Sequence, residues 1–187
     1  MIIYVHGFGS SGEGGKSILF KAYFKSINEP FIAPSLSYVP DLAIKTLEEL
    51  IESYADVKLI GSSLGGFYSM YLAGKYDLKA VLINPSIYPY KTLENHTGYA
   101  PNFYDGSCFE WNASHVNMLK KYETQVTHQE NFMLLLQKDD ELLDYQEAVK
   151  KLQNSSLHVE EGGNHSFEGI ERYFEDIKKF FNPLYII

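Results

Sequence analysis

Ser63 stands between two glycines, Gly61 and Gly65, in a stretch that fits the pattern G-x-S-x-G. A short apolar run over residues 57–60 precedes this stretch, and a helical pattern follows it to about Lys75. In such a strand-turn-helix arrangement the serine hydroxyl is exposed on a sharp turn, and glycines flank it because side chains would collide there. The pattern therefore predicts a serine nucleophile. Three fixed residues of common types also match by chance, so other residues must support the prediction.

A serine nucleophile needs a histidine as base and a carboxylate that orients the histidine. Of the six histidines, His165 alone lies in a glycine-bracketed loop after the last predicted strand. Asp140 follows an apolar strand and is our first choice of acid, while Asp144 and Asp139 remain alternatives. Ser63, Asp140 and His165 then occur in the order serine, acid, histidine, which is the order found in serine hydrolases with this kind of turn.

Residues 7–12 form a glycine-rich loop after the first predicted strand and fit the dinucleotide-binding pattern G-x-G-x-x-G. A dinucleotide site is disfavoured because no acidic residue ends the second predicted strand to hold a ribose. The stretch Gly15-Lys16-Ser17 is similar to the end of a phosphate-binding P-loop, but the glycine required five positions earlier is Ser10. A third interpretation assigns the loop to an oxyanion hole, with the backbone N–H groups of Phe8 and Leu64 as donors. We prefer it because one reaction then explains both glycine-rich stretches.

Short apolar runs alternate with stretches of helical periodicity along the chain. This alternation predicts an α/β fold in which helices cover both faces of a mostly parallel sheet, a three-layer α/β/α sandwich. The loops that carry Phe8, Ser63, Asp140 and His165 all follow predicted strands, so we expect them at the same edge of the sheet, where ligands bind. The predicted strands are 1–5, 31–33, 57–60, 80–83, 132–136 and 157–159. The predicted helices are 16–28, 41–54 with Asp41 as N-cap, the stretch from Ser63 to 75, 142–152 and 168–181.

The segment from about 86 to 130 departs from this alternation. It is rich in aromatic residues, with prolines, glycines and asparagines between them, and it has no regular pattern. Two interpretations stay open: an irregular connection whose aromatic side chains pack on the core, or a cap over a substrate pocket. We expect one domain over residues 1–187, with a cap-like or lid-like insertion at about 86–130.

The composition disfavours several classes of protein. Of the 187 residues, 45% are hydrophobic and 21% are charged, and the net charge of -8 disfavours nucleic acid or an anionic membrane surface as a partner. A single cysteine, Cys108, excludes an intramolecular disulfide and a cysteine-rich zinc site. No apolar run approaches the roughly 18 residues of a membrane span, so we expect a cytoplasmic protein with a small-molecule substrate. The sequence leaves the oligomeric state open.

Together these motifs resemble the YqiA-type esterases of the α/β-hydrolase superfamily. The resemblance covers essentially the whole chain and implies a compact α/β-hydrolase fold without the first strands of larger members. It also implies a serine esterase for carboxylic esters, with acyl thioesters as a further candidate class, and no metal or cofactor. Lys138-Asp139 replaces the small residue and glycine that usually precede the acid, which keeps Asp139 and Asp144 open as the acid. The matching stretches are 4–8, 61–68, 83–86, 135–137, 140–145 and 161–167.

A protein from another functional class could use the same scaffold. That alternative is a non-catalytic module that binds a small molecule or another protein. The sequence favours the enzyme, because a serine, an acid and a histidine all occur at suitable places.

Overall fold

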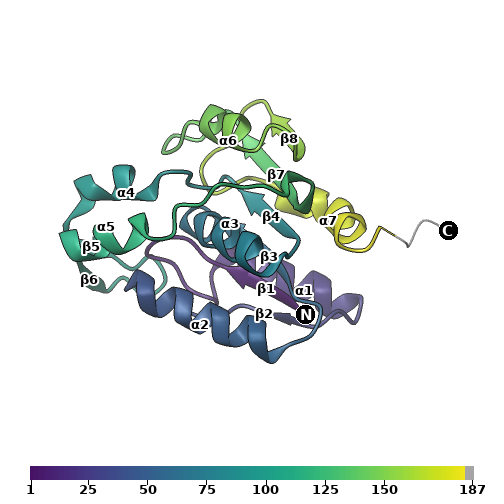
Figure 1. Ribbon diagram of the computed structural model, residues 1–187, viewed down its shortest axis with the longest axis horizontal. Helices are drawn as coiled ribbons and strands as arrows, with labels where there is room; N and C mark the ends of the chain where they lie inside the picture. Colours follow the sequence, from purple (N-terminus) through teal and green to yellow (C-terminus); the bar gives the residue numbers. More distant parts are fainter. Residues whose placement is uncertain (184–187) are drawn as a thin grey trace.

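The computed structural model describes residues 1–183. One sheet contains β1 (Ile2–Val5), β2 (Phe31–Ile32), β3 (Lys58–Ser62), β4 (Ala80–Ile83), β7 (Phe132–Gln137) and β8 (Ser156–Glu160). Its strand order is β2-β1-β3-β4-β7-β8, and all neighbouring strands run parallel (Figure 1). Ile3 pairs with Leu59, Leu59 with Ala80, and Val81 with Met133. The predicted α/β fold with a parallel sheet is confirmed.

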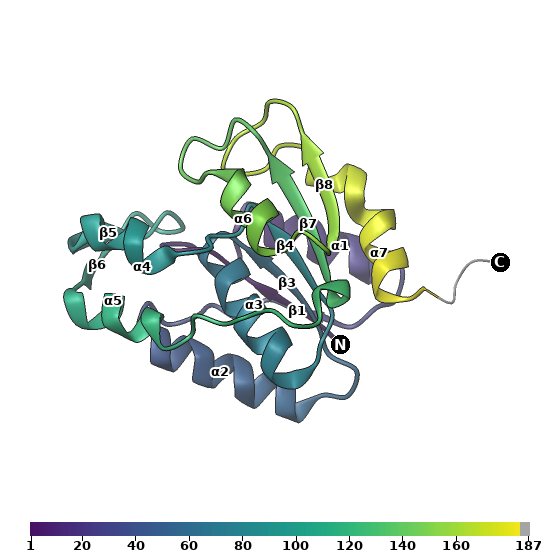
Figure 2. The ribbon, with the colours of Figure 1, turned by 45° about the horizontal axis from the view of Figure 1, so that its top comes forward.

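Five helices cover the two faces of this sheet: α1 (Gly15–Ser26), α2 (Pro40–Ser53), α3 (Leu64–Tyr76), α6 (Tyr145–Lys151) and α7 (Phe174–Phe181). Helices α2, α3 and α6 pack on one face, where Leu47 of α2 and Leu82 of β4 belong to one buried cluster. Helices α1 and α7 cover the other face, where Phe20 and Ile177 pack with Ile83 of β4 (Figure 2). Neighbouring residues of β4 thus face opposite helical layers, which explains why the strands are unbroken apolar runs in the sequence.

The segment between β4 and β7 contains α4 (Pro89–Thr92), β5 (Gly98–Pro101), β6 (Cys108–Trp111) and α5 (Ala113–Lys120). Strands β5 and β6 form an antiparallel pair that the sequence did not predict. These elements lie together at one end of the molecule, on the left in Figures 1 and 2. Trp111 is buried there, and its indole N–H donates to the Leu93 carbonyl at 3.0 Å. The rings of Trp111 and Phe109 lie edge-on to Phe8, with centroids 4.9 and 5.3 Å away, so the segment packs on the loop after β1.

The prediction that Asp41 caps the second helix is wrong. Helix α2 begins one residue earlier, at Pro40, and its N-cap is Val39. The Asp41 carboxylate instead accepts hydrogen bonds from Lys121 Nζ at 2.7 Å and from Tyr122 Oη at 2.8 Å. The Asp41 carboxylate is thus bound to donors about 80 residues away in the sequence, and α2 has no side-chain cap.

Two further helices begin later than predicted. The helix expected over 142–152 begins at Tyr145, because the Asp144 side chain is its N-cap and accepts from the Gln146 N–H at 2.9 Å. The helix expected over 168–181 begins as a 3₁₀ turn at Ile170–Tyr173 and continues as α7.

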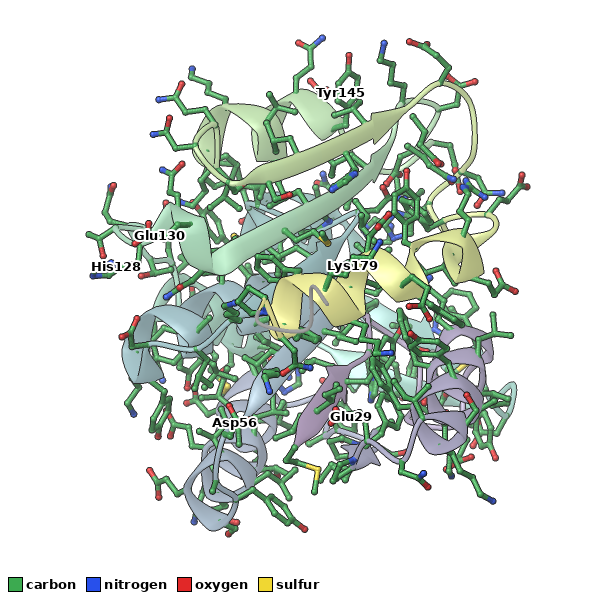
Figure 3. All side chains as sticks on the ribbon, turned by 90° about the vertical axis from the view of Figure 1, so that its right-hand side faces the viewer. Glu29, Asp56, His128, Glu130, Tyr145 and Lys179 are labelled. Carbon is green, nitrogen blue, oxygen red and sulfur yellow. The ribbon has the colours of Figure 1, made fainter. Side chains whose placement is uncertain are left out.

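The end of the molecule opposite the β5–β6 segment carries the connections that enter the strands (Figure 3). Glu29 precedes β2 and Asp56 precedes β3 at this end. Lys179 lies on α7, which covers the same face of the sheet as α1. The Asp56 carbonyl accepts from the Met1 ammonium at 2.9 Å, which holds β1 beside β3. None of the helices within residues 1–183 is long and apolar enough to cross a membrane.

Candidate active site

Ser63 lies on the turn between β3 and α3, with φ 55° and ψ -119°. A positive φ is costly for a residue with a side chain and persists only where the surroundings enforce it. A Cβ on Gly61 would lie 2.3 Å from the Gly65 carbonyl oxygen, and a Cβ on Gly65 would lie 2.0 Å from the Val5 carbonyl oxygen. Both positions therefore require glycine. The turn has the strained strand-to-helix geometry that the G-x-S-x-G pattern predicts.

Ser63, His165 and Asp140 lie in one hydrogen-bond chain. His165 Nε2 is 3.0 Å from Ser63 Oγ, and His165 Nδ1 is 2.9 Å from Asp140 Oδ2 and 3.0 Å from Asp140 Oδ1. The side chain of Asp140 is 2% exposed and that of His165 is 19% exposed. An ionised carboxylate only accepts hydrogen bonds, so Asp140 holds the ring proton on Nδ1 and leaves Nε2 as an acceptor for the serine hydroxyl.

The two alternative acids lie elsewhere. Asp144 caps α6, and its Oδ1 accepts from the Gln146 N–H. Asp139 is exposed, and its backbone N–H donates to the Gly162 carbonyl at 3.2 Å. Within the described part of the chain, the carboxylate at hydrogen-bond distance from the His165 ring is that of Asp140.

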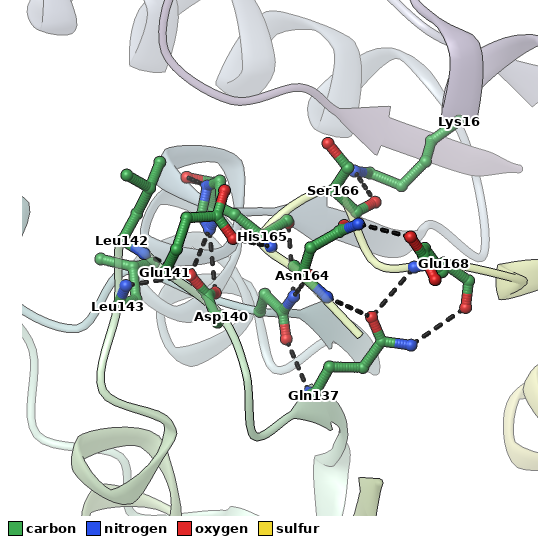
Figure 4. A network of polar contacts seen from close by, with 12 residues as sticks. Lys16, Gln137, Asp140, Glu141, Leu142, Leu143, Asn164, His165, Ser166 and Glu168 are labelled. Atoms are coloured by element: carbon green, nitrogen blue, oxygen red, sulfur yellow. Dashed lines mark hydrogen bonds and ion pairs between the residues drawn. The ribbon is translucent and has the colours of Figure 1, made fainter. Parts of the chain in front are cut away.

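Asp140 is also held by the backbone that follows it (Figure 4). The N–H groups of Leu142 and Leu143 both donate to its Oδ1 at 2.9 Å. Because these two N–H groups point at the carboxylate, residues 140–143 form a loop around it and are not helical. The loop therefore gives the carboxylate a fixed orientation toward His165.

Two buried amides at strand ends, those of Asn84 and Gln137, hold the loop that carries His165. Figure 4 shows Gln137 beside Asn164 and Glu168 of this loop. Asn84, after β4, donates through Nδ2 to the carbonyls of Asn164 and His165 at 2.9 and 3.3 Å, and its Oδ1 accepts from the Gln137 N–H at 3.0 Å. Gln137, the last residue of β7, accepts through Oε1 from the N–H groups of Asn164 and Glu168 at 3.1 and 2.9 Å. No role for either amide was predicted from the sequence. Their signal in the sequence is a polar residue at the carboxyl end of an apolar strand.

The backbone N–H groups of Phe8 and Leu64 are the predicted oxyanion donors. Phe8 lies in the loop after β1, Leu64 is the first residue of α3, and both line the pocket at Ser63. Within residues 1–183, neither N–H donates to a protein acceptor. A Cβ on Gly7 would lie 3.2 Å from Ser63 Cβ, so the loop passes close to the serine. Two backbone donors are therefore available beside Ser63.

His6 shapes this loop. Its Nδ1 is 2.8 Å from the Gly7 carbonyl oxygen, and its Nε2 accepts from the Leu36 N–H at 2.9 Å. These partners require the neutral ring with the proton on Nδ1. Burial lowers the pKa of His6, which keeps the ring neutral. His6 thus ties the loop after β1 to the loop after β2, and both its nitrogens are occupied.

Ser63 opens into a pocket of about 820 Å³. The segment between β4 and β7 supplies an apolar wall and polar groups such as His96 and Thr97. Further polar groups come from α1 and from the loops after β1, β7 and β8. Ser86 is buried in the wall, and its hydroxyl has no hydrogen-bond partner within the described chain. No group of three or more His, Cys, Asp or Glu side chains within residues 1–183 is arranged to hold a metal ion. The apolar wall includes Pro89, Leu93, Ala100 and Pro101, and the polar groups include Ser10, Lys16, Glu141 and Ser166.

Comparison with known proteins places this chain in a family. The model of the family described as "Uncharacterised protein family (UPF0227)" matches residues 1–182. A UPF0227 protein from Vibrio cholerae serotype O1 is 25% identical over 159 residues, which are 82% of this chain and 83% of that protein.

Solved structures share the fold at low sequence identity. Alpha/beta hydrolase domain-containing protein 10 from mouse has a TM-score of 0.76 and 19% identity, over 98% of this chain and 90% of that one. Est1E from Butyrivibrio proteoclasticus, with ferulic acid bound, has a TM-score of 0.72 and 14% identity, over 96% of this chain and 86% of that one. The chain therefore belongs to the UPF0227 family, the family of the YcfP and YqiA proteins, and has the α/β-hydrolase fold.

Proposed function

We propose that this protein is a serine hydrolase that cleaves carboxylic esters through an acyl-enzyme on Ser63. The observation that carries the proposal is the hydrogen-bond chain from Ser63 Oγ through His165 to Asp140. That chain opens into a pocket large enough for a small-molecule substrate. The α/β-hydrolase fold supports the same class of reaction.

In the acylation step, Ser63 Oγ attacks the carbonyl carbon of the ester while His165 Nε2 takes the hydroxyl proton. Asp140 stabilises the resulting imidazolium and keeps its own charge. The protonated His165 then gives its proton to the leaving oxygen, and the bond between the acyl carbon and that oxygen breaks.

The negative oxygen of the tetrahedral intermediate is stabilised by the N–H groups of Phe8 and Leu64. Each such donor contributes about 3 kcal/mol in comparable sites, because it is already oriented before charge develops. In the deacylation step, His165 activates a water molecule that attacks the acyl-enzyme and releases the acid. These steps use protein groups and water.

The same two steps can also cleave acyl thioesters, with a thiolate as the leaving group. Acyl thioesters are therefore a second candidate substrate class. A comparison of kcat/KM for 4-nitrophenyl acetate and for an acetyl thioester of similar size ranks the two classes.

A fluorophosphonate probe tests the nucleophile, because it phosphonylates an activated serine. We expect labelling of the wild type and of Ser26→Ala, an exposed control on α1, and no labelling of Ser63→Ala. Hydrolysis of 4-nitrophenyl acetate should fall at least about 10³-fold in Ser63→Ala, with an unchanged circular dichroism spectrum. Equal labelling of the wild type and Ser63→Ala would refute Ser63 as nucleophile.

The same experiment separates the enzyme from the alternative, a non-catalytic module that binds a small molecule or a protein. A correctly folded wild-type protein that neither reacts with the probe nor hydrolyses the ester would favour the binding module.

A further inference from the structure

Lys16 brings a positive charge to the pocket that the proposed reaction does not use. It is the second residue of α1 and lines the pocket together with Ser10 and Ser166. Its backbone is held in place by the next residue, because Ser17 is buried and its hydroxyl donates to the Gly12 carbonyl. The start of α1 therefore presents Lys16 to the pocket from a fixed position.

The ammonium of Lys16 has unused donors. It is half-buried, and one of its three N–H groups donates to the Ser166 carbonyl at 2.7 Å (Figure 4). Within residues 1–183, no carboxylate forms an ion pair with it. Burial lowers the pKa of Lys16 to about 8, and the more distant charge of Asp140 opposes this shift. Such a cation is stabilised when an anion enters the pocket.

The acidic group of the pocket lies away from Lys16. Glu141 is exposed, and its carboxylate accepts from the His165 backbone N–H at 2.9 Å. In Figure 4, Glu141 and Lys16 lie on opposite sides of the His165 loop. The charge of Lys16 is therefore available to a bound molecule.

The position of Lys16 indicates which part of an ester it meets. The leaving group takes its proton from His165 Nε2 and so lies on the His165 side of Ser63. Lys16 contacts the carbonyl of Ser166, the residue that directly follows His165. The apolar wall with Leu93 then remains for the acyl group.

We propose that Lys16 is a specificity-determining residue that binds an anionic group, a carboxylate or a phosphate, on the leaving-group part of the substrate. The inference rests on the proposed ester hydrolysis and narrows its substrates to esters or thioesters of an anionic alcohol or thiol. The two unused N–H groups of Lys16 donate to the anion. Hydrogen bonds to charged groups of this kind change affinity by about tenfold or more.

The kinetic test compares esters that differ in where they carry charge. They are 4-nitrophenyl acetate, 3-carboxy-4-nitrophenyl acetate, 4-acetoxyphenyl phosphate and mono-4-nitrophenyl glutarate, which carries its charge on the acyl side. For each ester, kcat/KM of Lys16→Met is divided by that of the wild type. We expect this ratio to be about tenfold lower for the esters with an anionic leaving group than for the neutral ester. The larger of the two effects identifies carboxylate or phosphate as the recognised group.

Two further variants are the controls. Lys16→Arg keeps the cation and should restore most of the preference for an anionic leaving group. Lys21→Met makes the same change in net charge on the same helix, at an exposed lysine that pairs with Glu13, and should behave as the wild type. Equal ratios for charged and neutral esters in Lys16→Met, or a loss confined to the glutarate ester, overturn the inference.

A binding measurement decides the inference without turnover. We would titrate 5-hydroxy-2-nitrobenzoate, the product of the carboxylate ester, into wild type, Lys16→Met and Lys21→Met and measure heat. Binding should weaken at least about fivefold in Lys16→Met alone. Equal binding to all three overturns the role of Lys16. Failure of the fluorophosphonate labelling overturns the proposed hydrolysis and with it the ester specificity, whereas anion binding by Lys16 is decided by this titration alone.

Discussion

Replacement of Asp140 by asparagine changes the proton pattern of His165 with almost no change of shape. In Asp140→Asn, the amide oxygen can still accept from the N–H groups of Leu142 and Leu143, which lie 2.9 Å from Oδ1. The amide nitrogen then faces His165 Nδ1. That nitrogen donates from the position 2.9 Å from Nδ1, while the oxygen at Oδ1, 3.0 Å from Nδ1, is already shared by two backbone N–H groups. The substitution therefore favours the tautomer with Nδ1 unprotonated and the proton on Nε2, directed at Ser63. In this tautomer His165 cannot accept the serine proton.

The expected loss in kcat is about 10⁴-fold, which is typical of a serine hydrolase whose catalytic histidine is held in the wrong tautomer. At about 1.4 kcal/mol per factor of ten, this loss equals about 5.5 kcal/mol of transition-state stabilisation. The free energy of unfolding should fall much less, by about 1–2 kcal/mol, because the two backbone hydrogen bonds to the side-chain oxygen are kept.

The assay is hydrolysis of 4-nitrophenyl acetate, with the free energy of unfolding measured in urea for every variant. Asp144→Asn and Asp139→Asn are the matched controls, since they make the same change within five residues. Asp144 caps α6, and asparagine caps a helix as well as aspartate does. Asp139 is exposed. Both controls should keep the wild-type kcat and stability.

Two results would refute the reasoning. One is an Asp140→Asn variant that is folded and keeps more than about a tenth of the wild-type kcat. The other is a large loss of kcat in Asp144→Asn or Asp139→Asn, which would show that the acid is a different aspartate.

Two further predictions concern the stability of the fold. Gly65→Ala should lower the free energy of unfolding, measured by thermal unfolding, by roughly 2 kcal/mol and should reduce esterase activity, because its Cβ would lie 2.0 Å from the Val5 carbonyl oxygen. The control is Gly74→Ala on the same helix, where a Cβ has room. This variant should be as stable as the wild type or more stable. Hydrogen bonding to Arg172 lowers the pKa of Glu160 to about 2 from an ordinary value of 4.5, so its stabilising contribution is present above pH 4.5 and is lost as the pH falls toward 2. Glu160→Gln should flatten the loss of stability over that pH range in urea unfolding, and an unchanged slope would contradict the assignment.

The order of elements and the edge of the sheet that carries the site were predictable from the sequence. Runs such as 80–83 and 132–136 are buried on both faces of the sheet, so their apolar pattern is continuous and indicates parallel strands. Gly61 and Gly65 are required by contacts within a few residues of Ser63 and with the adjacent strand. A short sequence motif is therefore enough to predict that these positions need glycine.

Pairings between distant segments could not be predicted. The β5–β6 hairpin has mostly exposed strands without an apolar run, and its Trp111 packs on Phe8 from the other end of the chain. Asp41 was expected to cap a helix, but side chains about 80 residues away in the sequence bind it. A local pattern contains no information on such partners.

The sequence by itself determined the α/β class, the strained turn at Ser63 and the strand ends at which the polar residues lie. Only the tertiary structure decided which of three nearby aspartates meets His165. All three have the same local chemistry, and the choice depends on how the loop after β7 folds against the loop after β8. Asn84 and Gln137 fix that contact through hydrogen bonds between strands that are adjacent in the sheet but far apart in the chain. Such contacts depend on long-range packing, and no short stretch of sequence specifies them.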